Sequence, residues 1–583
     1  MSVAPVRTVV EVLSRFDAEF REFSTAFSEG QYVLWLGSGI SRDRVPGVSE
    51  LLERVLEHLR SHVVDGDLNC IYQTALNEVL RIAGITTDER SALNLEETVS
   101  EWPLRQRIVS ALVTNYSKVL DVLVGDDNPE DYLVWTALDA ANTYGSPDLE
   151  PDVEHYCIAI LMLEGIVDSA VTANWDGLLE SAFENLTSVS SALLKVAVRP
   201  EDFRHHRARI ELIKFHGCAV LAREQEINYR ALLVARESQI STWTQQPENK
   251  SMRKHLELLY TDRLTLMIGL SAQDANLHTV FASAIQNYAR TWPALPPAVV
   301  LSEESLESHH RHLLRITYAN DHPGNGAEIA ASALLGSYAK PTLLALVISS
   351  LFGKIEFLLN RRLVVVWNQS SLGQAQSNLT WLREKVAVAA DLNHPERQVR
   401  TEYQREYLKN FIEFVKLVLT VFRTGMMPAP TEVDYQPLSD VPIQQAVLNA
   451  DFPSSQFGLL GLAASLIVRG QSQAIWTAHF GSAGEPEGGV VSLHAINRKL
   501  SVFLVKDVFA ATKLEMDEII AVSTSDSLVV TADEEALAQT RSPRSRFGRV
   551  GRSETGRFSL ASSLNETNSF EDLFEAFRLS GGY

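Results

Sequence analysis

The stretch YVLWLGSGIS, Tyr32 to Ser41, runs from large apolar residues directly into Gly-Ser-Gly. An unbroken apolar run of this length is typical of a strand that is buried on both faces of a parallel sheet. Glycine and serine after such a strand favour a tight turn that leads into a helix. The stretch therefore predicts a buried strand of an α/β domain, followed by a turn at the edge of its sheet.

Apolar runs of the same kind recur further along the chain. They begin at Ile166 (IVDSAVTAN), Ile210 (IELIKFHG), Leu264 (LTLMIGLS) and Pro297 (PAVVLS). Amphipathic helical patterns lie between them, for example VSELLERVLEHL from Val48. This alternation indicates a Rossmann-like α/β fold, a parallel sheet with helices on both faces.

Pattern and composition divide the chain into six segments. The first carries Phe16, Phe20, Phe23 and Phe27 on one helical stripe. The region 541–562 is rich in Arg, Ser and Gly, which indicates a flexible linker or a basic contact. The predicted segments are an N-terminal helix at 1–30, the parallel-sheet domain at 31–310 with a helical insertion at about 65–145, a helical domain at 311–430, an α+β domain with some antiparallel strands at 431–540, the linker at 541–562 and a terminal docking helix at 563–583.

The composition excludes several classes of protein. The chain has 583 residues and a formal net charge of −21, so we expect no direct nucleic-acid binding, which needs a positive surface. Cys70, Cys157 and Cys218 are too few and too far apart for a disulfide framework or a four-thiolate zinc site. We therefore expect a cytoplasmic protein with no metal in this chain.

Neither a secretion signal nor a membrane span is predicted. Charges such as Arg7 and Glu11 interrupt the N-terminal segment. The most apolar segment, Pro341 to Gly353, ends at Lys354, too soon for a bilayer-spanning helix. We expect it to be a buried helix.

Polar residues follow the ends of four predicted strands. Ligands of an open parallel sheet bind beyond the carboxyl ends of its strands, so these residues are expected to form one site. Gly37 and Gly39 let the first turn approach a diphosphate with free backbone N–H groups, while Ser38 and Ser41 add hydroxyl donors. The loop alone also fits a structural turn, since it is neither a Walker loop nor a full G-x-G-x-x-G fingerprint. The candidate residues are Gly37, Ser38, Gly39, Ile40, Ser41, Asn174, Asp176, His216, Gly269, Ser271 and Asp274.

The four motifs LGSGIS, VTANWD, KFHG and IGLSAQD occur in this order between residues 36 and 274. In this order they resemble the sirtuin family, and within it the bacterial sirtuin-like proteins of antiphage defence, which hydrolyse NAD. The resemblance covers about residues 30–305 and implies that NAD binds at the candidate residues. Two departures put deacetylation in doubt. The cysteines cannot form the zinc ribbon of deacetylating sirtuins, and RDRVPGVSELL replaces the segment that follows their first loop.

The resemblance implies an NAD glycohydrolase that forms ADP-ribose and nicotinamide. Asn174 would order a water beside the anomeric carbon, His216 would accept a proton, and Asp176 would hold the nicotinamide end or a ribose hydroxyl. Each residue also has a structural interpretation, as a turn or cap residue for Asn174 and Asp176 and as a core histidine for His216. The alternatives are an NAD-dependent deacylase or ADP-ribosyltransferase, and a non-catalytic nucleotide-binding scaffold for a partner ATPase.

An unregulated NAD hydrolase would harm its own cell, so we expect residues 311–583 to restrain or trigger the sheet domain. The resemblance further implies abortive antiphage defence by NAD depletion, a homo-oligomer and a protein partner such as a HerA-type ATPase. The N-terminal phenylalanine stripe and the terminal helix are the candidate docking elements.

Overall fold

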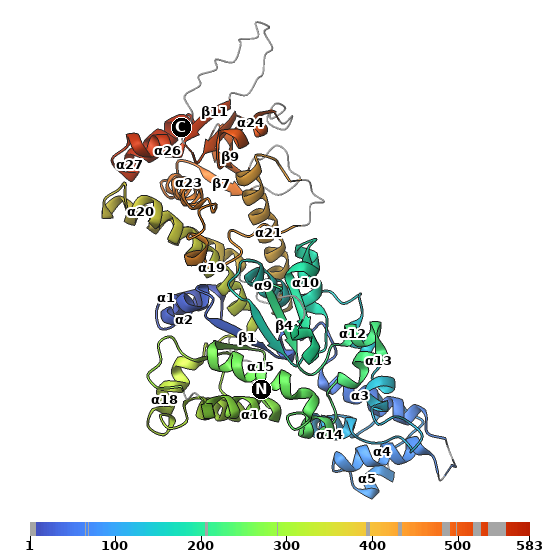
Figure 1. Cartoon of the computed structure of the whole chain (residues 1–583). Coiled ribbons are helices and arrows are strands. Elements are labelled where there is room, and N and C mark those ends of the chain that lie inside the picture. Colours follow the sequence, from blue (N-terminus) through green and yellow to red (C-terminus); the bar gives the residue numbers. More distant parts are fainter. Residues whose placement is uncertain are drawn as a thin grey trace.

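The computed structural model describes residues 7–583 except 65, 68, 92, 205–207, 288–289, 392–396, 429–433, 481–489, 497, 517–525 and 534–554. A sheet of six strands, all parallel, lies at its centre in the order β3-β4-β2-β1-β5-β6 (Figure 1). The Rossmann-like fold class is thereby confirmed. The strands are β1 (Tyr32–Leu36), β2 (Ser169–Thr172), β3 (Leu194–Ala197), β4 (Ile210–Lys214), β5 (Leu264–Ile268) and β6 (Val299–Ser302).

Both faces of this sheet are covered by helices because successive residues of each strand point to opposite sides. Leu34 and Leu36 of β1 lie in one buried cluster with α1, α2, α9, α10 and α19. Val33 and Trp35 lie in a second cluster with α15, α16, α17 and α18. These helices are α1 (Val9–Asp17), α2 (Arg21–Ser28), α9 (Val153–Leu163), α10 (Leu178–Leu186), α15 (Lys250–Asp262), α16 (Ala275–Asn287), α17 (Ser308–Tyr318), α18 (His322–Ala333) and α19 (Ala339–Leu363).

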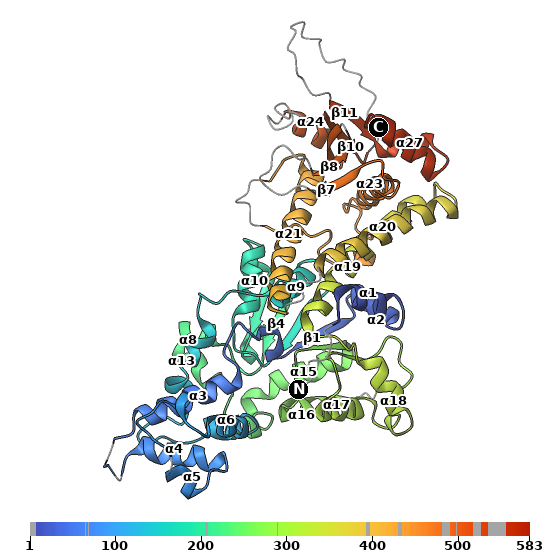
Figure 2. The same ribbon diagram turned by 180° about the vertical axis from the view of Figure 1, so that it is seen from behind.

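The segment between β1 and β2 contains helices and has a buried core of its own. Helix α3 packs its apolar face into this core. Segments that follow β4 adjoin it at one end of the molecule (Figures 1 and 2). The helices involved are α3 (Val48–Ser61), α4 (Ile71–Ile82), α5 (Thr87–Ser91), α6 (Arg105–Val113), α7 (Tyr116–Leu120), α8 (Ala140–Gly145), α12 (Ala219–Glu224), α13 (Glu226–Tyr229) and α14 (Glu237–Thr242).

A second sheet forms the opposite end of the molecule, beyond the long helices α19, α20 and α21 (Figure 2). Its order is β11-β10-β9-β8-β7. The pairs β7–β8 and β8–β9 are antiparallel, as expected, whereas β9, β10 and β11 run parallel to one another. The elements are α20 (Gln369–Ala390), α21 (Arg397–Thr424), α22 (Ile443–Ala446), α23 (Ser454–Ser472), β7 (Thr477–Phe480), β8 (Val491–Ala495), β9 (Arg498–Val505), α24 (Val508–Met516), β10 (Asp526–Thr531), β11 (Thr555–Ser559), α26 (Leu560–Glu566) and α27 (Phe570–Ser580).

The segment expected to be a linker is only partly described. Residues 541–554 lie outside the described residues. Residues 555–562, however, form β11 and the start of α26, so the second sheet extends into the region where we expected a linker. Arg557 on β11 binds Glu515 of α24 through two hydrogen bonds.

Both predicted docking elements pack within this chain. The N-terminal stripe is divided between α1 and α2, and its four phenylalanines are buried. Phe23 meets Tyr32 of β1 with a ring-centroid distance of 5.0 Å. On α27, Phe574 packs against Trp476 at 6.0 Å and Phe570 against Trp367 at 6.0 Å. Neither apolar face is therefore open to a partner in this structure.

Helix α9 is bound to the C-terminal half at both ends. At its N-terminus, Asp152 accepts hydrogen bonds from Lys340 Nζ at 2.9 Å and from Arg405 Nε at 2.7 Å. At its C-terminus, Glu164 accepts a hydrogen bond from Lys354 Nζ at 2.7 Å. Lys354 belongs to α19, which is apolar and long enough to cross a membrane by composition alone, but 67% of its most apolar window is buried. In this structure α19 is a core helix.

Candidate active site

The strand register brings the four predicted motifs to one edge of the sheet. Leu36 at the end of β1 pairs with Thr172 of β2 and with Ile268 of β5, and Thr172 pairs with Lys214 of β4. Residues that follow these four positions in the chain must therefore emerge side by side, because all strands are parallel. The loops of LGSGIS, VTANWD, KFHG and IGLSAQD meet at this edge.

The two glycine loops interlock. Gly37 N donates to Ile268 O and Gly39 N to Gly269 O, each at 3.0 Å. A Cβ on Gly39 would lie 2.6 Å from Gly269 Cα, and one on Gly37 would lie 2.3 Å from Gly269 O. Gly269 itself has a φ of +61°, which favours glycine. The first loop thus requires glycine at these positions because the backbone of the second loop lies directly against it.

This packing changes the expected role of the first loop. We expected the N–H groups of Gly37 and Gly39 to be free for a diphosphate, but both donate to the β5 strand end and its loop. The hydroxyl of Ser41 is also used within the protein, since Ser41 is buried and donates to Asp176 Oδ2 at 2.9 Å. Ser38 is exposed and makes no side-chain hydrogen bond with the described residues.

The remaining loop residues divide into buried and exposed positions. Ile40 is buried in the core beneath the first loop. Ser271 is exposed and, like Ser38, forms no side-chain hydrogen bond within the described part of the chain. These two serines are the hydroxyl groups of the candidate set that remain available to a ligand.

The side-chain amide of Asn174 has a defined orientation. Its Nδ2 lies 3.1 Å from Gly37 O and 3.4 Å from Ser41 Oγ. A carbonyl oxygen only accepts, so the nitrogen must face Gly37 and the amide oxygen must point the other way. Asn174 thus holds its Oδ1 as an acceptor at the edge of the sheet.

Asp176 has a structural position. Its side chain is buried, accepts from Ser41 Oγ through Oδ2, and faces the backbone N–H of Leu178 at the start of α10 with Oδ1 at 3.3 Å. Its backbone carbonyl accepts from the buried ammonium of Lys214, which also pairs with Glu180. The helix-capping interpretation fits these contacts, and both carboxylate oxygens have partners inside the protein.

His216 follows β4 directly beside this group. The indole N–H of Trp175, the neighbour of Asn174, donates to His216 O at 2.9 Å. Nε2 of His216 lies 3.4 Å from Asp274 Oδ2 and 3.4 Å from Asn276 Nδ2. Burial lowers the pKa of His216, and the Asp274 carboxylate opposes this only in part. The ring is therefore neutral at pH 7, between one group that donates and one that accepts.

Two cavities adjoin these residues. A small one of about 10 Å³, which is room for about one water molecule, lies among Asn174, Asp176, Lys214 and the apolar residues beneath them. An open pocket of about 600 Å³ is lined by α14, the start of α15 and the start of α16, including Asn276. Its volume lies in the range of small-molecule sites. The larger pocket thus begins next to His216, and the Gly37 loop does not line it.

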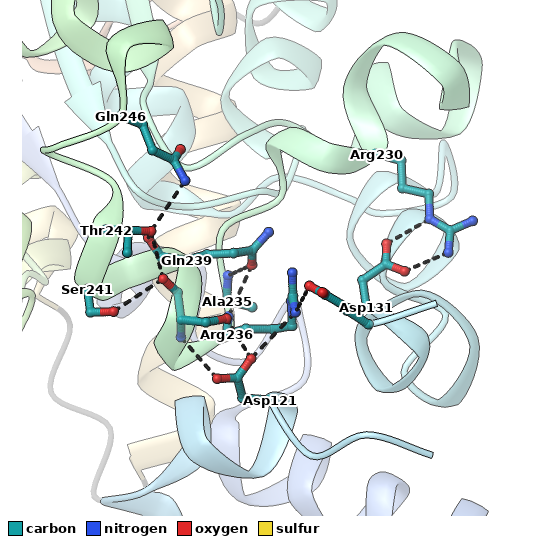
Figure 3. A network of polar contacts seen from close by, with 11 residues as sticks. Asp121, Asp131, Arg230, Ala235, Arg236, Gln239, Ser241, Thr242 and Gln246 are labelled. Carbon is teal, nitrogen blue, oxygen red and sulfur yellow. Dashed lines mark hydrogen bonds and ion pairs between the residues drawn. The ribbon is translucent and has the colours of Figure 1, made fainter. Parts of the chain in front are cut away.

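The insertion holds one wall of this pocket in place (Figure 3). Ser238 of α14 donates to Asp121 from its backbone N–H at 3.0 Å and from its hydroxyl at 2.7 Å. Arg236 lies 3.5 Å from the same carboxylate, and Arg230 binds Asp131 through two hydrogen bonds of 2.7 Å. The position of α14 beside the site therefore depends on the helical insertion.

Three residues of the site escaped the sequence analysis. Asn276 lies near the predicted Asp274 and could have been found from its place at the start of α16. Lys214 was missed because a lysine at the end of a buried strand is usually predicted to be exposed. His155 lies in a helix that is buried on all sides. The pattern D-x-x-H at residues 152–155, which forms a capping box, could have pointed to it.

We expected no metal in this chain, and the arrangement of the described cysteine, histidine and acidic side chains can be compared with that expectation. Cys70, Cys157 and Cys218 are buried and unpaired. Within the described ranges no group of three or more His, Cys, Asp or Glu side chains is arranged to hold a metal ion. His205 and His206, which fit no metal-ligand spacing, lie outside these ranges.

Residues 168–321 match the family model of the SIR2-like domain. The match supports the sirtuin-like resemblance and implies that this domain binds or uses NAD. It spans β2 to α17 and contains Asn174, Asp176, His216 and the second glycine loop, while the first glycine loop precedes it. The comparison with curated proteins yields no match to the chain.

Proposed function

We propose that this chain is an NAD glycohydrolase, which cleaves NAD with water to ADP-ribose and nicotinamide. The observation that supports this most directly is the placement of Asn174 and His216 side by side. They occupy neighbouring positions at the carboxyl edge of the sheet, inside the segment that matches the SIR2-like domain. One offers an oriented acceptor and the other a neutral imidazole.

The chemistry needs few groups. The nicotinamide of NAD is a cationic pyridinium that leaves as a neutral molecule, so no acid is required at the leaving group. The bond between the anomeric carbon and the pyridinium nitrogen breaks with its electron pair on nitrogen. The oxygen of a water forms the new bond, and the proton that this water loses passes to a base. The protein must hold the sugar, orient the water and accept the proton.

Asn174 and His216 suit the last two tasks. Asn174 Oδ1 can accept a hydrogen bond from a water, because its Nδ2 is held by Gly37 O. The Nε2 of His216 meets both Asn276 Nδ2 and Asp274 Oδ2. A neutral ring that carries its proton on Nε2 can donate it to the Asp274 carboxylate, which leaves the lone pair of Nδ1 to accept the proton from water. The same carboxylate then stabilises the protonated ring, as a general base requires.

The pattern of cysteines and the segment after the first loop favour water over a peptide as the acceptor. We further propose that the hydrolysis serves antiphage defence by NAD depletion and that assembly or a partner, such as a HerA-type ATPase, controls it. The contacts of α9 with Lys340, Arg405 and Lys354 support control by the C-terminal half, since they connect that half to the helix beneath the site.

Nicotinamide release from NAD by the purified chain tests the proposal, with and without the products of neighbouring genes. Asn174→Ala and His216→Ala should each lower turnover ~10²–10⁴-fold. The matched control is Asn142→Ala, an exposed asparagine in the insertion whose side chain bonds to Asp139. Release that depends on an added lysine peptide or protein acceptor would instead favour a deacylase or transferase. Tight NAD binding without turnover under every condition would favour a scaffold.

A further inference from the structure

His155 is a buried histidine that connects α9 to the first glycine loop. It is fully buried in the first turn of α9. On one side, the backbone N–H of Asp152 donates to its Nδ1 at 3.1 Å. On the other side, its Nε2 lies 3.3 Å from Ser41 Oγ. The ring thus bridges the N-terminus of α9 and the hydroxyl that adjoins Asn174 and Asp176.

These contacts define the tautomer of His155. A backbone N–H can only donate, so Nδ1 must carry a lone pair and no proton. The ring is neutral, because burial lowers the pKa of His155 to about 4 against the opposing effect of Asp176 and Asp152. A neutral imidazole without a proton on Nδ1 carries it on Nε2. His155 therefore donates to Ser41 Oγ.

The direction of every hydrogen bond around Ser41 then follows. Ser41 Oγ accepts one hydrogen bond from His155 Nε2 and faces a second donor in Asn174 Nδ2 at 3.4 Å. Among the described residues, the acceptor for the hydroxyl proton is Asp176 Oδ2, at 2.9 Å. With both lone pairs and its proton used, Ser41 has a single favourable rotamer, and the Asn174 amide nitrogen has a fixed partner beside Gly37 O.

A second histidine shows the same arrangement behind the second glycine loop. His310 lies in the first turn of α17, and its Nδ1 accepts from the backbone N–H of Glu307 at 3.2 Å. Its Nε2 lies 2.8 Å from Leu270 O, a group that can only accept. Here the Nε2–H tautomer is required from both sides. Each interlocked loop is thus held from behind by a buried histidine in a capping box.

We propose that His155 is a positioning residue, which acts through Ser41 to hold the Asn174 amide with its oxygen toward the substrate. His155 has no role in proton transfer, because Nδ1 and Nε2 are both used inside the protein. The kinetic part of this inference rests on the proposed NAD hydrolysis. The tautomer and the hydrogen-bond directions are independent of it.

The kinetic test compares two substitutions at one position. His155→Leu removes the donor, and we expect kcat to fall ~10²-fold, as for a small misplacement of a reacting group, with little change in KM. His155→Gln keeps an N–H near the position of Nε2 and should restore most of kcat. The control is His255→Gln, a half-buried histidine that binds Glu211 at 3.1 Å near the opposite end of β4. Melting curves of all variants identify loss of fold.

A second measurement needs no substrate. Imidazole ¹⁵N chemical shifts distinguish a nitrogen that carries a proton from one that does not, and the His155→Gln spectrum assigns the signal. We expect an Nε2–H tautomer that persists below pH 6. An Nδ1–H tautomer, or an equal kcat for folded His155→Leu and wild type, would overturn the inference. If wild type does not cleave NAD, the proposed function fails while the ¹⁵N spectrum still decides the position of the proton.

Discussion

Lys354 and Glu164 form an ion pair in which both side chains are almost completely buried, at 2% and 1% exposure, with 2.7 Å between Nζ and Oε2. The pair joins α19 to the C-terminus of α9. Glu164 also accepts from the hydroxyl of Tyr435 at 2.9 Å and from the backbone N–H of Leu438 at 3.0 Å. The carboxylate thus joins its own helix α9 to two further segments that are far apart in sequence, α19 and residues 435–438.

Loss of the lysine should therefore lower the free energy of unfolding. Lys354→Met leaves a buried carboxylate without its cation, and we expect a loss of about 3–5 kcal/mol in the free energy of unfolding, measured by urea denaturation. The double variant Lys354→Met/Glu164→Gln should lose less than the sum of the single variants, because no buried charge remains. Arg81→Met, which removes an exposed partner of Glu78, should leave the midpoint unchanged. Additive effects of the two buried substitutions would contradict a coupled pair.

The pH profile of NAD cleavage should have an acid limb. Burial holds the pKa of His216 below the ordinary histidine value of 6.5. The ring accepts a proton only while neutral, so activity should be constant near pH 7 and fall as the pH drops through the lowered pKa. Asp274→Asn removes the charge that opposes this shift and should move the limb to lower pH. The measurement is kcat/KM for NAD between pH 4 and 8 in buffers that keep the chain folded. A limb that begins above pH 7 would argue against His216 as the base.

Stability in acid should depend on His155. Its pKa is about 4 in the folded chain and about 6.5 in an unfolded one. Above pH 6.5 both states are neutral; as the pH falls from there, only the unfolded state takes up a proton. Relative to His155→Gln, wild type should lose about 3 kcal/mol of unfolding free energy between pH 6.5 and 4. The charges that face the ring, Asp152, Asp176 and Arg44, are common to both proteins, so the difference isolates the histidine. Parallel pH curves for the two proteins would refute the assignment.

The interlocked loops should not tolerate a methyl group. Gly39→Ala places a Cβ 2.6 Å from Gly269 Cα, so one loop must move, at a cost on the order of 1–3 kcal/mol. NAD cleavage should fall as well, because Gly37 O holds the Asn174 amide. The matched control is Gly47→Ala before α3, where no described atom lies within 4 Å of the added carbon. Thermal melting and nicotinamide release report the two effects. A Gly39→Ala protein with an unchanged melting temperature would show that the loops have room.

The sequence predicted the parallel sheet because five of its six strands lie within predominantly apolar runs. The sixth, β3, is an edge strand with Lys195 in its centre and three half-buried residues, so it has no such run. The strand order could not be read from the chain, because it depends on which helices cross over which face. In the second sheet, DSLVVTA was expected as an antiparallel strand, but β10 at this position pairs parallel with β9. Strand β11 was not predicted, and its pairing with β10 joins residues on either side of the segment 534–554.

For the site, sequence reasoning found which residues meet but not always what they do. Order along parallel strands was enough to bring Asn174 and His216 together. The roles of Ser41 and Asp176 depend on side-chain partners such as His155 and Leu178, which lie on other elements. Those contacts are set by how α9 and α10 pack under the sheet, and that packing leaves no pattern in the site motifs themselves.

The contact between Gly39 and Gly269 also constrains how this fold can vary over generations. Neither position can acquire a side chain while the other loop stays in place. A smaller residue at one position cannot make room for a side chain at the other, because both are already glycine. Each position should therefore be constrained by the other, although they are 230 positions apart in the chain, since 269 − 39 = 230. In a collection of descendants selected after random mutagenesis, both glycines should be retained, and this retention can be counted without any knowledge of the substrate.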